Sequence, residues 1–171
     1  KPGGWGIMIP KTSSELEMMR EAGRIVAMVH QKMSEMIKPG ITTKELDVAA
    51  YKIIKNAGAT PSFLNYQGFP ASICTSINDV VIHGIPSGRT LQEGDIISID
   101  VGANFHGYHG DSAWTYAVGR ISQENQHLLE IGEKCLYEGL KHIRHGIRLT
   151  DISHAIQVCF LDNGYSTPLD Y

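Results

Sequence analysis

Residues 98–114 read SIDVGANFHGYHGDSAW, in which two β-prone arms flank a turn-forming centre. This pattern predicts an antiparallel β-hairpin. With a four-residue turn over 104–107, Asp100 and Asp111 would face each other directly, with Cβ atoms about 5 Å apart. Facing carboxylates repel each other unless a cation offsets their charge, and aspartate oxygens suit divalent metal ions. The hairpin therefore predicts a metal site, and the alternative is a surface hairpin with two solvated aspartates.

The segment before the hairpin also predicts strands. Residues 72–86, SICTSINDVVIHGIP, combine Ile and Val with turn residues, a pattern typical of strands joined by turns. His83 would end an apolar strand just before a glycine turn, either as a buried core residue or as a group beside a site. His109 would lie on the same side of the hairpin as Asp111, where it could donate to a metal ligand.

Helical patterns surround the predicted strands. Residues 12–40 and 42–58 have apolar residues every three or four positions, and each stretch begins with a Thr-x-x-Glu capping box. Helices return in 122–146 and 150–164. Segregated helices and antiparallel strands predict an α+β fold.

A weak internal repeat relates the two helical regions. Shifting the sequence by 106 residues lays 40–58 on 146–164 without a gap, with four identities in 19 positions. In both places a long helix is followed by a short stop and a second helix. The first helix pair leads into the predicted sheet, so the order of elements predicts two related halves, of which the second lacks its sheet.

The composition excludes several classes of protein. The 171 residues are 42% hydrophobic and carry a net charge of −3, so no basic surface for nucleic acid is expected. No apolar run reaches the roughly 18 residues of a membrane span. Cys74, Cys135 and Cys159 form no CxxC pair, which argues against a disulfide framework and favours a reduced, cytoplasmic setting. Residues 1–7 resemble a tag remnant or a disordered arm.

The common motifs of other enzyme classes are missing from the sequence. It contains no GxSxG, GxxxxGK[ST], HExxH or GxGxxG. Serine hydrolase, P-loop, zincin and dinucleotide-binding chemistries are therefore not indicated. The carboxylate pair remains the main chemical feature of the chain.

Three stretches resemble one enzyme family. KPGITTKELD (38–47), ICTSINDVVIHGIP (73–86) and GDIISIDVGANFHGYHGDSA (94–113) are similar to type I methionine aminopeptidases, and the likeness runs from about Met8 to Tyr171. The resemblance implies a pita-bread (creatinase/aminopeptidase-like) fold, with the first pseudo-symmetric half plus the helices of the second half. It also implies that 8–171 form a single catalytic domain, incomplete at its C-terminal end.

The resemblance assigns roles to individual residues. The family removes the initiator methionine from nascent chains, which implies a methionyl aminopeptidase with two divalent metal ions (Mn, Fe, Co or Zn). Asp100 matches the aspartate that chelates one metal, and Asp111 matches the aspartate that bridges both. His83 matches the catalytic histidine that contacts the substrate amide and stabilises the tetrahedral intermediate. The methionine pocket would be lined by Phe63, Tyr66, Phe69 and Cys74.

The resemblance also limits what this chain should do alone. A histidine and two glutamates that complete the family's metal site have no counterpart here, so weak metal binding and little or no peptidase activity are expected. Expected partners are peptides that begin with methionine, the ribosome, and a second copy of the chain at an uncovered edge. The alternatives are a non-catalytic pita-bread binding module or truncated pseudo-enzyme, and a prolidase or aminopeptidase P-like enzyme.

Overall fold

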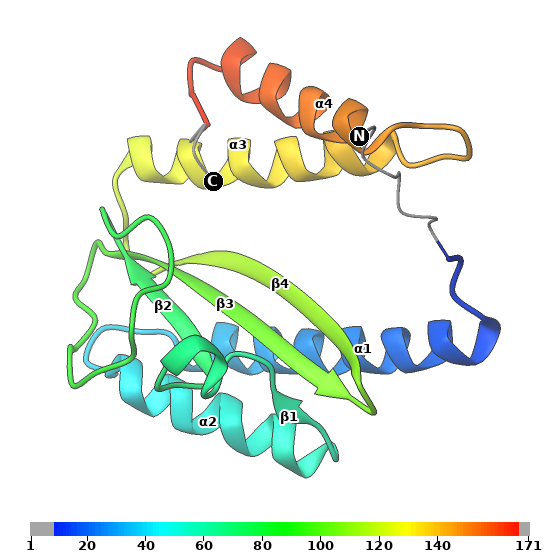
Figure 1. The fold of residues 1–171 in the computed structure, drawn as a ribbon. Helices are drawn as coiled ribbons and strands as arrows, with labels where there is room; N and C mark the ends of the chain where they lie inside the picture. Colours follow the sequence, from blue (N-terminus) through cyan, green and yellow to red (C-terminus); the bar gives the residue numbers. More distant parts are fainter. Residues whose placement is uncertain (1–8, 168–171) are drawn as a thin grey trace. The chain divides into compact units, whose positions relative to one another are not determined.

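The computed structural model describes residues 9–167 of the chain. The elements follow one another as α1 (Ser13–Met36), α2 (Thr43–Asn56), β1 (Thr60–Pro61), the 3₁₀ turn η1 (Tyr66–Gly68), β2 (Ile73–Ile77), β3 (Ile96–Phe105), β4 (Tyr108–Ala117), α3 (Gln123–Lys141) and α4 (Leu149–Asp162) (Figure 1). They form two compact units, with the boundary after Gly119. The predicted arm at residues 1–7 lies outside the described residues. No helix within 9–167 is long and apolar enough to cross a membrane.

The first two helices begin where their capping boxes predict. At α1 the Thr12 backbone N–H donates to Glu15 Oε2 (2.7 Å), and the Glu15 N–H donates to Thr12 Oγ1 (3.3 Å). Thr42 and Glu45 repeat this arrangement at α2. Such caps satisfy N–H groups that have no partner within the helix. The apolar face of α1 is buried as the sequence pattern predicts, through Ala22, Ile25, Val26, Val29 and Met33.

The sheet of the first unit has β3 at its centre and is antiparallel throughout. β4 pairs with β3 along one edge, while β2 and β1 share the other edge. Figure 1 shows α1 and α2 together on one face of this sheet. Alternate residues of β3 are fully buried in the core on that face, namely Ile97, Ile99, Val101 and Ala103. Because side chains alternate along a strand, Ser98, Asp100 and Asn104 lie on the opposite face.

The stretch after β2 is a loop, so the prediction of an apolar strand that ends at His83 is wrong. The loop folds back on β2: the Thr75 N–H donates to the Gly84 carbonyl oxygen (2.7 Å), and the Gly84 N–H donates to Ser76 Oγ (3.1 Å). A Cβ atom on Gly84 would lie 2.1 Å from the Thr75 carbonyl oxygen, so glycine is required for this approach. The apolar run 80–82 therefore precedes a tight return to the same strand.

The second unit is a pair of helices that pack around a small core. The N-terminus of α3 is capped by Ser122, whose Oγ accepts from the Asn125 N–H (3.1 Å). A Cβ atom on Gly139 of α3 would lie 2.6 Å from Ile156 Cγ1 of α4. This glycine therefore lets the two helices approach closely. The buried residues of the core are Ile131, Cys135 and Cys159.

The internal repeat predicted from the sequence reappears in the backbone. The shift of 106 residues carries the bounds of α2, Thr43–Asn56, onto those of α4, Leu149–Asp162. Gly40 and its counterpart Gly146 both have positive φ, at 96° and 83°. Gly58 and its counterpart Gly164 do too, at 76° and 80°. The same glycine-bounded helix thus occurs in each unit, since glycine adopts this conformation without a steric penalty.

Candidate metal centre

Asp100 and Asp111 lie on the same face of the sheet, on neighbouring strands. The register pairs Asp111 with Gly102, so the two carboxylates are diagonal neighbours and not directly opposite. The predicted register is wrong by two residues because the turn consists of His106 and Gly107 alone. Both turn residues have positive φ, 51° and 89°, which is the two-residue hairpin turn that matches the twist of the strands. A shift of two residues keeps every side chain on its face, so the aspartates still share one face as predicted.

The two carboxyl groups interact strongly. Burial, the negative charge of Asp111 and a hydrogen bond between the carboxyls raise the pKa of Asp100 to about 6, against a lowering by the charge of His83. Partial burial also raises the pKa of Asp111, while its hydrogen bond with Asp100 lowers it. Asp100 is therefore the carboxyl of the pair that takes up a proton as the pH falls towards about 6, and near neutral pH the two negative charges repel each other. A divalent cation in place of that proton would offset the repulsion.

His83 lies in the loop after β2, close enough to Asp100 for its charge to lower the pKa of that carboxyl. Its backbone has a φ of 58°, a conformation that is uncommon for any residue other than glycine. The contacts of the neighbouring Gly84 with β2 fix this part of the loop. Backbone strain of this kind is concentrated at functional sites. The structure therefore brings His83 to the carboxylate pair, as an exposed side chain.

Cys74 and Phe63 adjoin the same pair. Cys74 lies opposite Asp100 in the β2–β3 ladder and is 4% exposed. Burial and the charges of Asp100 and Asp111 raise the pKa of its thiol to about 12, so the thiol stays protonated and behaves as a small apolar group. Phe63 lies over Gly102, where a Cβ atom would be 2.7 Å from Phe63 Cε1. Glycine at this position allows an aromatic ring to lie beside the two aspartates.

Tyr66 and Phe69 come from the loop that carries Phe63. The Asn65 N–H donates to the Phe69 carbonyl oxygen (2.8 Å), which closes the loop on itself. Tyr66 is 65% exposed, and Phe69 is half-buried. The structure thus places Phe63 and Cys74 beside the carboxylates, with Tyr66 and Phe69 further along the same loop.

A polar group beside Asp111 includes residues that the sequence did not indicate. His109 lies on the face of Asp111, as the alternation along β4 predicts, and its charge lowers the pKa of that carboxyl. His109 Nδ1 shares a hydrogen bond with Ser62 Oγ (2.9 Å), and its Nε2 lies 3.2 Å from Asn104 Nδ2. The alternation of side chains along β3 predicts that Asn104 lies on this face. Ser62 has no such signal, because it lies 47 residues before His109 and meets it only in the fold.

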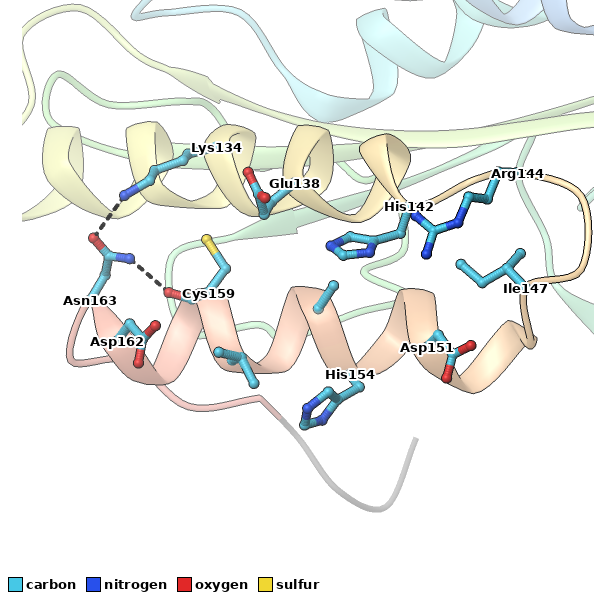
Figure 2. A pocket seen from close by; sticks show the side chains of 12 residues that line it. Lys134, Glu138, His142, Arg144, Ile147, Asp151, His154, Cys159, Asp162 and Asn163 are labelled. Carbon is cyan, nitrogen blue, oxygen red and sulfur yellow. Dashed lines mark hydrogen bonds between the residues drawn. The ribbon is translucent and has the colours of Figure 1, made fainter.

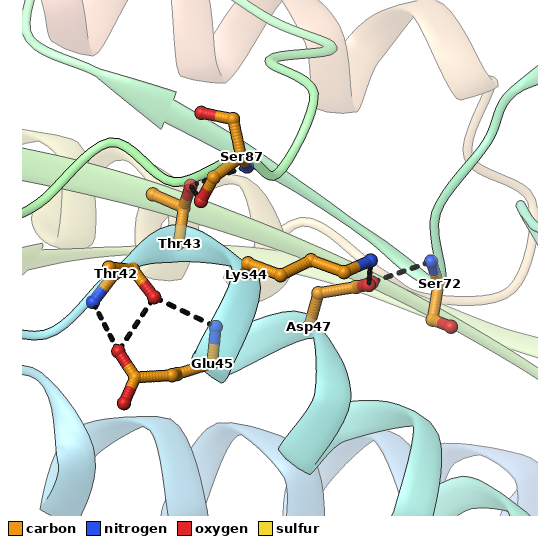
Figure 3. Close-up of polar contacts among 7 residues, drawn as sticks. All are labelled: Thr42, Thr43, Lys44, Glu45, Asp47, Ser72 and Ser87. Atoms are coloured by element: carbon orange, nitrogen blue, oxygen red, sulfur yellow. Dashed lines mark hydrogen bonds and ion pairs between the residues drawn. The ribbon is translucent and has the colours of Figure 1, made fainter.

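The first turns of α2 hold both segments that flank the site, as Figure 3 shows. The carboxylate of Asp47, a residue that is 5% exposed, accepts from the Ser72 backbone N–H (2.7 Å) just before β2. Thr43 Oγ1 donates to the Ser87 carbonyl oxygen (3.0 Å) and accepts from the Ser87 N–H (2.8 Å). These bonds satisfy buried polar groups and tie β2 and the His83 loop to one helix.

The donor set in the described part of the chain is a pair of carboxylates. Within residues 9–167, no group of three or more His, Cys, Asp or Glu side chains is placed to hold a metal ion. Two neighbouring aspartates with raised pKa values nevertheless fit a divalent cation, because oxygen donors suit it and its charge offsets their repulsion. Asp100 and Asp111 are therefore the candidate donors for such an ion within the described residues.

A separate cavity of about 650 Å³ lies in the second unit, between α3, α4 and the segment that joins them (Figure 2). Its lining includes Glu138, His142, Asp151 and His154, and it contains none of the predicted site residues. All of its lining residues follow Gly119, so none of them belongs to the unit that holds the carboxylate pair.

Comparisons with known proteins bear on the family and the fold of the chain. The chain matches the family model of metallopeptidase family M24 over residues 17–169. It is 54% identical over 165 residues to methionine aminopeptidase 1 of Bacillus subtilis (strain 168), a match that covers 96% of this chain and 66% of that protein. The crystal structure of methionine aminopeptidase from Thermotoga maritima superposes with a TM-score of 0.93 at 37% identity, covering 96% of this chain and 67% of that one. The chain therefore spans about two thirds of the length of these relatives.

A more distant solved structure shares the fold of the chain but does not show its family. Prolidase from Pyrococcus furiosus has a TM-score of 0.81 at 22% identity, over 91% of this chain and 44% of its own, and so shares the fold alone. The methionine aminopeptidase structures confirm the predicted α+β pita-bread fold, with the first half and the helices of the second. The predicted resemblance to methionine aminopeptidases is also confirmed. Since the family model covers most of the sequence, the chain belongs to metallopeptidase family M24.

Proposed function

We propose that this chain carries the first metal ligands and the methionine pocket of an aminopeptidase that removes the initiator methionine from nascent polypeptides. The observation that carries the proposal is the pair Asp100 and Asp111, which shares one face of the sheet with a protonated Cys74 and adjoins Phe63. The relatives named methionine aminopeptidase support the same activity. Residues 8–171 would then form one catalytic domain.

Asp100 and Asp111 would hold divalent metal ions (Mn, Fe, Co or Zn), of which a complete site would have two. The raised pKa values of both carboxyls support this role, because a cation relieves the cost of keeping two neighbouring aspartates ionised. When bound, such ions activate water as a nucleophile near neutral pH and polarise a carbonyl group.

The remaining residues act on the substrate. His83 would donate a hydrogen bond to the substrate amide and stabilise the tetrahedral intermediate, a role supported by its position next to Asp100. Cys74 and Phe63 would contact the methionine side chain, and Tyr66 and Phe69 would extend the same wall. An aromatic and sulfur-containing lining suits the polarisable thioether of methionine.

The proposal includes the binding partners of the chain and its cellular compartment. The substrates are peptides that begin with methionine, at the ribosome, in the cytoplasm. The absence of a membrane-crossing helix from the described residues is compatible with this setting. A second copy of the chain at the uncovered edge is a further predicted partner. With two metal ligands among residues 9–167, we expect this chain alone to bind metal weakly and to release little methionine.

Peptide binding in the presence of Zn²⁺ tests the proposed specificity. Met-Ala-Ser should shift the NMR signals of Phe63 and Cys74, whereas Lys-Ala-Ser should not, because a charged side chain is costly to bury beside them. Binding of the dipeptide Ala-Pro tests the alternative of a prolidase-like enzyme. Equal binding of Lys-Ala-Ser, or tighter binding of Ala-Pro than of Met-Ala-Ser, would contradict the proposal.

The non-catalytic alternative makes a different prediction for one substitution. A binding module that does not use metal should keep its affinity for Met-Ala-Ser after Asp100→Asn. The proposed site should lose the Zn²⁺-dependent part of that affinity. Asp79→Asn, the same change at an exposed turn residue, is the matched control and should leave binding unaltered.

A further inference from the structure

Two cysteines of the second unit face each other. The Cys135 thiol of α3 donates to Cys159 Sγ of α4, with a sulfur–sulfur distance of 2.7 Å. Both side chains are buried, Cys135 completely and Cys159 with 8% exposed. Neither has a part in the proposed peptidase chemistry, whose residues all precede Gly119. The proposed peptidase chemistry therefore does not explain the contact between the two sulfurs.

The packing around the two sulfurs holds them together. Ile131 shares their buried core, and the partly buried Ile156, Phe160 and Tyr165 pack against it. Gly139 permits the close approach of α3 and α4 one turn further along, where a Cβ atom would lie 2.6 Å from Ile156 Cγ1. The sulfurs need to close only from 2.7 Å to the roughly 2.05 Å of a disulfide bond.

The cavity of the second unit gives one of these sulfurs a route to solvent. Cys159 lines the cavity of about 650 Å³, and Figure 2 shows its side chain there among polar residues. Cys135 does not line it. A small oxidant that enters the cavity would therefore meet Cys159 first.

We propose that Cys135 and Cys159 form a dithiol site that a hydroperoxide oxidises to a disulfide between α3 and α4. The Cys159 sulfur attacks one peroxide oxygen, the O–O bond breaks, and water leaves with the thiol proton, which yields a sulfenic acid at Cys159. The Cys135 sulfur then attacks the Cys159 sulfur, the S–O bond breaks, and a second water leaves with the Cys135 proton. Two thiols and one hydrogen peroxide thus give one disulfide and two water molecules.

The different surroundings of the two cysteines set the order of these steps. Burial and the hydrogen bond to Cys159 raise the pKa of Cys135 to about 12, so Cys135 remains a thiol until the neighbouring sulfur is oxidised. Cys159 lines the cavity, so it is the cysteine that a small oxidant can reach. This order makes Cys159 the residue that reacts with peroxide and Cys135 the residue that resolves the sulfenic acid.

Mass spectrometry of the chain after treatment with hydrogen peroxide tests the proposal. The intact protein should lose about 2 Da, and two of its three thiols should become blocked to N-ethylmaleimide after denaturation. Trypsin separates the two cysteines, because it cuts after Lys134, Lys141 and Arg148. The digest should contain a Cys135–Cys159 linked peptide that a reductant splits.

Single substitutions provide the controls. Cys74→Ser should form the same linked peptide, since Cys74 lies in the other unit. Cys135→Ser should form none, and should instead accumulate a sulfenic acid at Cys159 that dimedone traps. Because a linked loop restricts the unfolded chain, the oxidised protein should melt on the order of 10 °C above the reduced protein.

Two results would overturn the proposal. One is full alkylation of Cys135 and Cys159 at a peroxide dose that oxidises exposed methionines. The other is a link that uses Cys74 in place of either cysteine. Neither outcome depends on whether the chain has aminopeptidase activity.

Discussion

Asp111 on β4 lies opposite Gly102 on β3, which sets its carboxylate diagonal to that of Asp100 on one face of the sheet. Burial and the neighbouring charge raise the pKa of Asp100 to about 6. The same fold that brings these groups together thus makes the metal-free protein less stable at neutral pH. Stability alone would not favour a pair of aspartates arranged in this way, so we expect the pair to serve binding.

Replacing Asp100 by Asn should therefore stabilise the metal-free protein. The substitution keeps the shape of the side chain and removes one of two repelling charges. We expect a gain of about 1–2 kcal/mol at pH 7.5, after allowing for solvent screening of a partly exposed pair. Thermal unfolding in the presence of a chelator measures it, and Asp79→Asn should give no gain.

The stability of the metal-free protein should change with pH in a defined direction. The folded pKa of Asp100 lies above its ordinary value of 3.8, so the folded state binds the proton more tightly than the unfolded state. This contribution to stability is present below about pH 4 and is lost as the pH rises through about 6. The advantage of Asp100→Asn should accordingly grow over that window. An advantage that is constant from pH 4 to pH 8 would show that the charge is not its cause.

Gly110 of β4 lies against the backbone of α1. A Cβ atom at this position would lie 2.6 Å from the Ala22 carbonyl carbon and the Gly23 nitrogen, and backbone atoms cannot yield locally. Gly110→Ala should cost about 1–3 kcal/mol in urea denaturation. The control is Gly23→Ala, where the new Cβ meets nothing within 4 Å and should stabilise the helix by about 0.5–1 kcal/mol.

Asp47 is the buried acceptor that holds the start of β2. Asp47→Ala leaves the Ser72 N–H, in a residue that is 2% exposed, without its partner. We expect a loss of about 1–3 kcal/mol and faster hydrogen exchange at the Ser72 amide. Lys44→Ala removes only the exposed half of the ion pair with Asp47 and should change stability by a few tenths of a kcal/mol. Equal effects of the two substitutions would assign the role of Asp47 to the ion pair.

The helices and the repeat were readable from the sequence because their determinants are local. The capping boxes at Thr12 and Thr42 mark the starts of α1 and α2, and the structure confirms both. The repeat was readable at four identities in 19 positions because glycine is needed at each end of the repeated helix. A backbone with positive φ restricts the residue type whatever the surroundings are.

The site itself was only partly readable, because its details depend on turns and on long-range contacts. The alternation of side chains along the strands predicts that Asp100 and Asp111 share one face. The register of the hairpin depends on the left-handed backbone conformation of His106, which the residue type alone does not predict. The return of the His83 loop depends on hydrogen bonds between Gly84 and β2. Ser62 joins His109 only after β1 pairs with the end of β3.

The central claim is that Asp100 and Asp111 bind a divalent metal ion, and Mn²⁺ titration of the isotope-labelled chain tests it most directly. Paramagnetic broadening detects even weak, partial occupancy. We expect substoichiometric Mn²⁺ to broaden the amide signals of residues 99–101 and 110–112 first. Asp79→Asn should leave this pattern intact, and Asp100→Asn and Asp111→Asn should each abolish it. Broadening that spreads evenly over exposed carboxylates, or that persists in both variants, would contradict the account.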